Sequence, residues 1–72
     1  MENRDLLNIA VFIDFENFAE PEVFDAKALT DKLKERGRLI MKKAYADWGR
    51  FSQVKRQMLQ NSIELIEMPS HG

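Results

Sequence analysis

An apolar run that ends on a carboxylate constrains this chain more than any other feature of its sequence. Residues 9–13, IAVFI, are β-branched or aromatic apart from Ala10, and Asp14 follows them directly. Because five residues are too few for a helix, the run predicts a strand buried on both faces. A buried charge is costly unless it is paired or holds a cation. We therefore expect Asp14 to face solvent and a cation at the end of the strand.

After this strand the pattern changes to that of an amphipathic helix. Asp25 is a good N-cap, and Phe24 and Leu29 have the spacing of a hydrophobic staple. Apolar residues then keep to one side and charged residues to the other, over about three turns. Gly37 stands where a C′ glycine would end the helix.

Three further segments continue the alternation. Residues 38–47 predict a second strand, in which two consecutive lysines are the weak point. Residues 50–61 predict a second helix, because their apolar side chains recur at i, i+3 and i+7. Residues 62–68 predict a third strand, and Glu64 and Glu67 suit an edge position.

The order of these segments predicts an α/β fold of the three-layer, doubly wound type with a parallel sheet, here as a partial β-α-β-α-β unit. Parallel crossovers are right-handed almost without exception. If the chain steps across the sheet in one direction, both helices lie on the same face. The other face, and one edge of the first strand, then have no cover within these residues. We therefore expect a homo-oligomer that forms through the first strand or through the bare sheet face.

Polar residues at the carboxyl ends of the strands are the candidate site, because open parallel sheets bind ligands there. Asp14 ends the first strand, Asp47 ends the second with Trp48 beside it, and residues 69–72 leave the third. Each residue also has an ordinary interpretation. A strand-terminal Asp14 can bond loop amides, and Asn17 and Asp47 are common turn residues. Trp48 is expected to pack in the core or at its rim, although stacking on a base is the sharper alternative.

Composition narrows the class of protein only in part. Eleven basic and twelve acidic side chains give a net charge of -1, which favours neither nucleic acid nor membrane as a partner. No apolar segment approaches the ~20 residues that cross a bilayer, so no membrane partner is expected. The chain has no cysteine, which excludes disulfides and is compatible with a cytoplasmic location. His71 has no second ligand at metal spacing, and we expect it to be exposed.

Three stretches together resemble a known family. VFIDFENF at residues 11–18, KKAYADW at 42–48 and IELIEMPSHG at 63–72 are similar to the start of an NYN domain of the LabA-like group, within the PIN-like ribonuclease superfamily. The resemblance implies that residues 1–8 are a lead-in. It also implies that residues 9–72 are the N-terminal part of such a domain.

The resemblance carries expectations about chemistry. In such domains acidic residues gather Mg²⁺ or Mn²⁺ at the strand ends to hydrolyse RNA. On that pattern Asp14 corresponds to the first catalytic, metal-holding acid and Asn17 to the polar residue beside it. Asp47 falls on a recurrent position that supports the ligands or the substrate. The family's further acids come after residue 72, and a single carboxylate holds Mg²⁺ weakly, so we expect this chain alone not to cut RNA.

Two alternatives remain open from the sequence. One is a catalytically dead binding or scaffolding module that keeps the fold without the acids. The other is a haloacid-dehalogenase-type phosphotransferase, which also places an Asp after its first strand. That chemistry uses a second Asp two residues later as general acid, and this chain has Glu16 there.

Overall fold

A computed structural model describes residues 7–18 and 20–69, so the predicted exposure of His71 lies outside the described residues. All strand pairs are parallel, and the order in the sheet is β1-β2-β3. The predicted α/β class is therefore confirmed, and the predicted bounds agree with the structure to within two residues. The elements are β1 (Asn8–Asp14), η2 (Phe15–Asn17), η3 (Pro21–Val23), α1 (Ala26–Lys34), β2 (Arg38–Ala46), α2 (Ser52–Gln60) and β3 (Glu64–Glu67).

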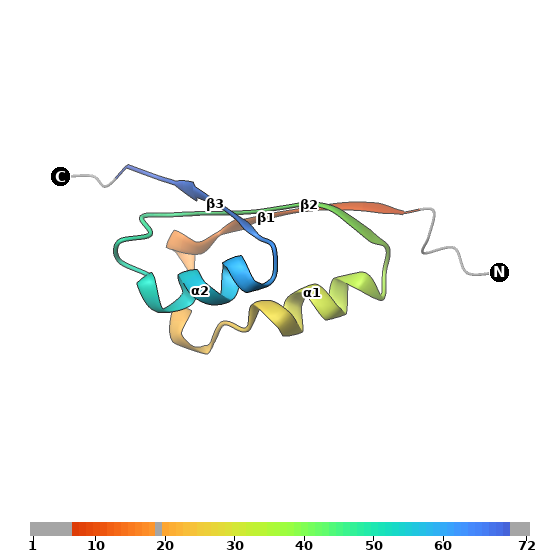
Figure 1. The fold of residues 1–72 in the computed structure, drawn as a ribbon, viewed down its shortest axis with the longest axis horizontal. Helices are drawn as coiled ribbons and strands as arrows, with labels where there is room; N and C mark the ends of the chain where they lie inside the picture. Colours follow the sequence, from red (N-terminus) through yellow and green to blue (C-terminus); the bar gives the residue numbers. More distant parts are fainter. Residues whose placement is uncertain (1–6, 19, 70–72) are drawn as a thin grey trace.

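Both helices lie on the same face of the sheet, as the right-handed crossovers require (Figure 1). The described residues thus form two layers, one of sheet and one of helices. This arrangement corrects the expectation that the first strand is buried on both faces. Ile13 points to the helices and is 6% exposed, whereas Phe12 points to the bare face and is 58% exposed. No helix in the described part of the chain is long and apolar enough to span a membrane.

An aromatic cluster fills the space between the helices and the carboxyl end of the sheet. Phe15 in η2 lies at its centre and is fully buried. Its ring centroid is 4.8 Å from that of Phe18, 5.2 Å from Phe24, 5.1 Å from Phe51 and 5.9 Å from Trp48. Three of these four contacts are edge-to-face, the geometry that aromatic pairs prefer. The cluster joins η2 and the residues before α1 to the loop between β2 and α2.

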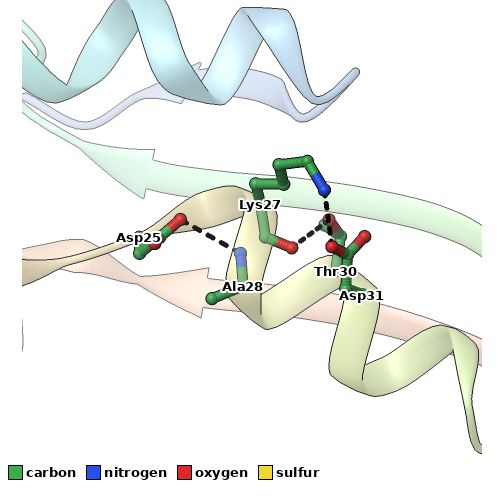
Figure 2. A network of polar contacts seen from close by, with 5 residues as sticks. All are labelled: Asp25, Lys27, Ala28, Thr30 and Asp31. Carbon is green, nitrogen blue, oxygen red and sulfur yellow. Dashed lines mark hydrogen bonds and ion pairs between the residues drawn. The ribbon is translucent and has the colours of Figure 1, made fainter.

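The start of α1 follows the sequence prediction (Figure 2). The Ala28 amide donates to Asp25 Oδ1 at 3.0 Å, which confirms Asp25 as the N-cap. Lys27 and Asp31 form an exposed i,i+4 pair at 2.7 Å. Their side-chain hydrogen bond raises the pKa of Lys27 and lowers the pKa of Asp31. The Thr30 hydroxyl donates to the Lys27 carbonyl at 3.1 Å, so the buried Thr30 has its partner within the helix.

The helix ends differ from the sequence prediction at Gly37. This glycine does not take the left-handed φ of a C′ residue. It is needed for close approach instead, because a Cβ there would lie 2.8 Å from the Leu7 carbonyl oxygen. The left-handed residue is Ser62, which follows α2 with a φ of 60°. The next amide, of Ile63, donates to the Met58 carbonyl at 2.9 Å, which closes a Schellman motif.

A glutamine in α2 joins the two helices. Gln57 Oε1 accepts from the Ala26 amide at 2.6 Å, and its Nε2 donates to the Phe24 carbonyl at 3.0 Å. The first amides of a helix have no partner within the helix, so this contact supplies one from outside. Gln57 thus fixes where α1 begins relative to α2.

We expect Gln57→Ala to lower the free energy of unfolding by about 1–3 kcal/mol, because it leaves two partly buried backbone groups without their partner. The measurement is urea unfolding followed by fluorescence of the single tryptophan, Trp48. Gln60→Ala is the matched control, since Gln60 is exposed on the same helix. Equal unfolding midpoints for the two variants would contradict the role assigned to Gln57.

Candidate functional site

A cleft of about 410 Å³ lies at the carboxyl end of the sheet, where the sequence predicts a site. It is bordered by the ends of all three strands. All three predicted site residues line it, and their chemical roles remain a prediction. The lining residues are Asp14, Glu16, Asn17, Asp47, Arg50, Met68 and Pro69.

Asp14 and Asn17 form the side of the cleft that β1 supplies. Asp14 is the last residue of the strand and is exposed, as expected. The single turn of η2 then brings Asn17 back beside it, because residues three apart in a 3₁₀ turn stand on the same side. Asn17 Nδ2 donates to Asp14 Oδ2 at 2.5 Å. The Asp-x-x-Asn spacing thus gives a carboxylate whose orientation is held by an amide.

Glu16 joins the two sides of the cleft. Its Oε2 accepts from the backbone amide of Asp47 at 2.5 Å, and its Oε1 pairs with Arg50 Nη1 at 3.2 Å. Arg50 also stands 5.3 Å from the centroid of the Phe51 ring. The sequence left the direction of Glu16 open. The structure shows that its carboxylate holds the β2–α2 loop against η2.

Asp47 lines the opposite side of the cleft, directly after β2, and Trp48 follows it into the core. Asp47 is half-buried. A Cβ at Gly49 would lie 3.5 Å from Asp47 Oδ1, so the Asp47 side chain lies against the backbone of Gly49. Trp48 is 3% exposed, and its indole N–H donates to the Ile66 carbonyl at 3.1 Å. The ordinary interpretation of Trp48 as a packing residue is confirmed, and its ring is not available to stack on a base.

The oxygen atoms of Asp14 and Asn17 are of the kind that binds a hard cation, but they are too few to form a complete metal site. Carboxylate and amide oxygens are the ligands that Mg²⁺ and Mn²⁺ prefer. Among residues 7–18 and 20–69, however, no three His, Asp or Glu side chains are close enough together to hold a metal ion. The described residues therefore do not fit a complete metal centre. Asp14 and Asn17 amount to one part of a ligand set.

Comparison with known proteins decides the family. The family model of the NYN domain matches residues 8–71, almost the whole chain. The chain belongs to the NYN domain family. NYN domains are PIN-like nucleases, which bind RNA and generally depend on divalent metal ions, and the chain has the corresponding ribonuclease-like fold. Neither the curated proteins nor the solved structures compared with the chain give a match.

Two residues of this NYN site have no signal in the local sequence. Glu16 and Arg50 lie 34 positions apart, and Glu16 and the Asp47 amide lie 31 apart. No short motif or periodicity relates positions at such a distance. Only the parallel pairing of β1 with β2, which sets Asp14 beside Tyr45, brings the two loops together.

We expect Glu16→Ala to speed hydrogen exchange of the Asp47 amide by roughly three- to tenfold, because one hydrogen bond is worth about 0.5–1.5 kcal/mol. Glu16→Gln keeps an acceptor for that amide and should stay near the original rate. The exchange is followed by NMR on the labelled chain, with Glu22→Ala as the control for an exposed glutamate outside the cleft. An unchanged rate in Glu16→Ala would show that the loops are held by something else.

Proposed function

We propose that residues 9–72 are the N-terminal part of a metal-dependent ribonuclease domain of the LabA-like group, which hydrolyses RNA phosphodiester bonds in the cytoplasm when complete. The observation that supports this proposal most is the hydrogen bond between Asn17 and Asp14 in the cleft at the strand ends, in a chain of the NYN family. Asp14 is the proposed catalytic, metal-holding acid. Asn17 orients it, and Asp47 supports the substrate or the ligands from the opposite side.

The chemistry explains why this part of the domain is proposed to be inactive alone. Hydrolysis with hard divalent cations needs several oxygen ligands to fix the ion, polarise the phosphate and generate hydroxide. Bound Mg²⁺ or Mn²⁺ would supply that Lewis acidity, with Asp14 as one ligand. Glu16 is engaged with the Asp47 amide and Arg50, so it is a poor substitute for a missing acid.

A catalytically dead binding or scaffolding module is the second candidate. The observation that favours it is the lack, among the described residues, of any group of three metal-binding side chains. The phosphotransferase alternative has less support. Its general acid would have to be Glu16, and that carboxylate holds the β2–α2 loop in place.

Self-association through β1 or the bare sheet face is also part of the proposal. Large apolar side chains on that face are open to water, among them Phe12 at 58% and Met41 at 41% exposure. Each such side chain forgoes roughly 1.5–3 kcal/mol of burial. A chain of this size has little stability to spare against that loss.

The metal role of Asp14 can be tested on this chain. We expect Mn²⁺ to broaden the amide NMR signals of residues 14–17 first, with weak affinity because one carboxylate gives an incomplete site. Asp14→Asn should remove this selective broadening. Glu64→Gln, which changes an exposed carboxylate on β3, the strand that does not pair with β1, should leave it intact. Broadening that persists in Asp14→Asn would assign Asp14 to loop capping alone.

We expect the 72-residue chain to cleave single-stranded RNA no faster than background in Mg²⁺ or Mn²⁺, because its described residues hold too few ligands. Cleavage is measured with end-labelled RNA over several hours. Activity that survives repurification and disappears in Asp14→Ala would show that the chain is a complete enzyme.

A further inference from the structure

Arg50 is the only positively charged residue among the described residues that line the cleft. It stands in the loop between β2 and α2, where its amide donates to the Asp47 carbonyl at 2.9 Å and closes a turn. Three carboxylates, those of Asp14, Glu16 and Asp47, line the same cleft. These carboxylates repel a polyanion such as RNA, so its approach depends on a positive charge at the same place.

Two contacts hold the guanidinium of Arg50 in place. Its Nη1 donates to Glu16 Oε1 at 3.2 Å, and its central carbon is 5.3 Å from the centroid of the Phe51 ring. The Phe51 ring packs edge-to-face on the buried ring of Phe15, with the two centroids 5.1 Å apart. A long side chain that is already held loses less conformational entropy when it binds a ligand. Arg50 is therefore oriented before a ligand arrives.

The ion pair with Glu16 leaves most of the guanidinium available. A guanidinium carries five N–H donors, and the Glu16 contact engages Nη1 only. The Arg50 side chain is 63% exposed. Its remaining donors can form paired hydrogen bonds with two oxygens of a phosphate, because the planar guanidinium matches that geometry.

We propose that Arg50 binds a backbone phosphate of single-stranded RNA in this cleft and that Glu16 positions it. The inference rests on the proposed function, which makes RNA the substrate, and it names the residue that receives the RNA backbone. A guanidinium stays charged at neutral pH and needs no metal ion for that charge. This chain should therefore bind RNA weakly even though its described residues give only part of a metal site.

A purely structural role explains Arg50 less well. Glu16 already connects η2 to the β2–α2 loop through the Asp47 amide, so Arg50 is not needed for that connection. The Arg50–Glu16 pair is also open to water, and exposed ion pairs stabilise a fold only a little. An arginine that is held in the cleft and still has donors to spare is better explained by a ligand.

Other cations of the chain are engaged or stand away from the cleft. Lys42 Nζ donates to the Asn61 carbonyl at 2.9 Å, and Lys27 pairs with Asp31 on α1. Arg36 is exposed and precedes β2, whose other end borders the cleft. The nine residues of β2 span roughly 30 Å, so Arg36 is an arginine of the same charge at the far end of the strand.

NMR titration of the labelled chain with a single-stranded oligouridylate, without metal ions, tests the proposal. We expect RNA to shift the amide signals of residues 47–51, and uridine without phosphate to leave them in place. Arg50→Gln should raise the dissociation constant about tenfold, because a hydrogen-bonded charge is lost. It should also lower the slope of log affinity against log salt by about 0.7, the value for one phosphate contact on a single strand.

Two matched variants separate a phosphate contact from a general effect of charge. Arg50→Lys should regain part of the affinity, because lysine keeps the charge without the planar fork. Arg36→Gln removes the same charge far from the cleft and should leave affinity and salt slope nearly unchanged. Equal losses in Arg50→Gln and Arg36→Gln, or an original chain that binds no RNA, would overturn the assignment of Arg50.

The metal role of Asp14 is measured separately, since selective Mn²⁺ broadening of residues 14–17 requires no RNA. We expect this broadening to persist in Arg50→Gln. Its loss would show that the substitution disturbs the whole cleft and would overturn a direct role for Arg50. Broadening that persists in Asp14→Asn would instead refute the proposed metal role, whether or not Arg50 binds RNA.

Discussion

The fully buried ring of Phe15 organises both the core and the site of this NYN domain. It follows Asp14 directly, and its contacts reach Phe24 before α1, Trp48 after β2 and Phe51 before α2. Burying this ring turns the chain inward immediately after the strand. Asp14 therefore lies at the rim of the core with its carboxylate in solvent. The packing of Phe15, and not a contact of the Asp14 side chain, sets this position.

The same turn explains the polar residues that follow. Once Phe15 points inward, η2 leaves Glu16 and Asn17 on the outside, where each takes a different task. Asn17 returns to Asp14, and Glu16 reaches the Asp47 amide and Arg50. One short motif thus holds the Asp14 carboxylate in one orientation and also connects the end of β1 to the loop after β2. These contacts hold the cleft in shape, although the described residues supply only part of a metal site.

The one-sided sheet is the second constraint on function. Two crossovers in the same direction place both helices on one face, and among residues 7–18 and 20–69 nothing covers the other face or pairs with the outer edge of β1. Residues 9–13 of β1 are apolar and uncharged, and the last residue of the strand, Asp14, is the candidate metal ligand.

The sequence by itself determined the helices and strands, and it indicated that the candidate site lies at the carboxyl ends of the strands. Strand and helix periodicity, the Asp25 cap and the right-handed crossover rule are local or general, so they can be read without coordinates. The rule also predicted that the helices share one face, and the motif around Asp14 indicated the family. Tertiary structure alone decided that Phe15 is the centre of the core, that Glu16 pairs with the β2–α2 loop and that Gln57 caps α1. It also decided that Gly37 serves close approach to Leu7 rather than a left-handed turn. These contacts join residues about thirty positions apart, and their partners are fixed only when the parallel strands are in register.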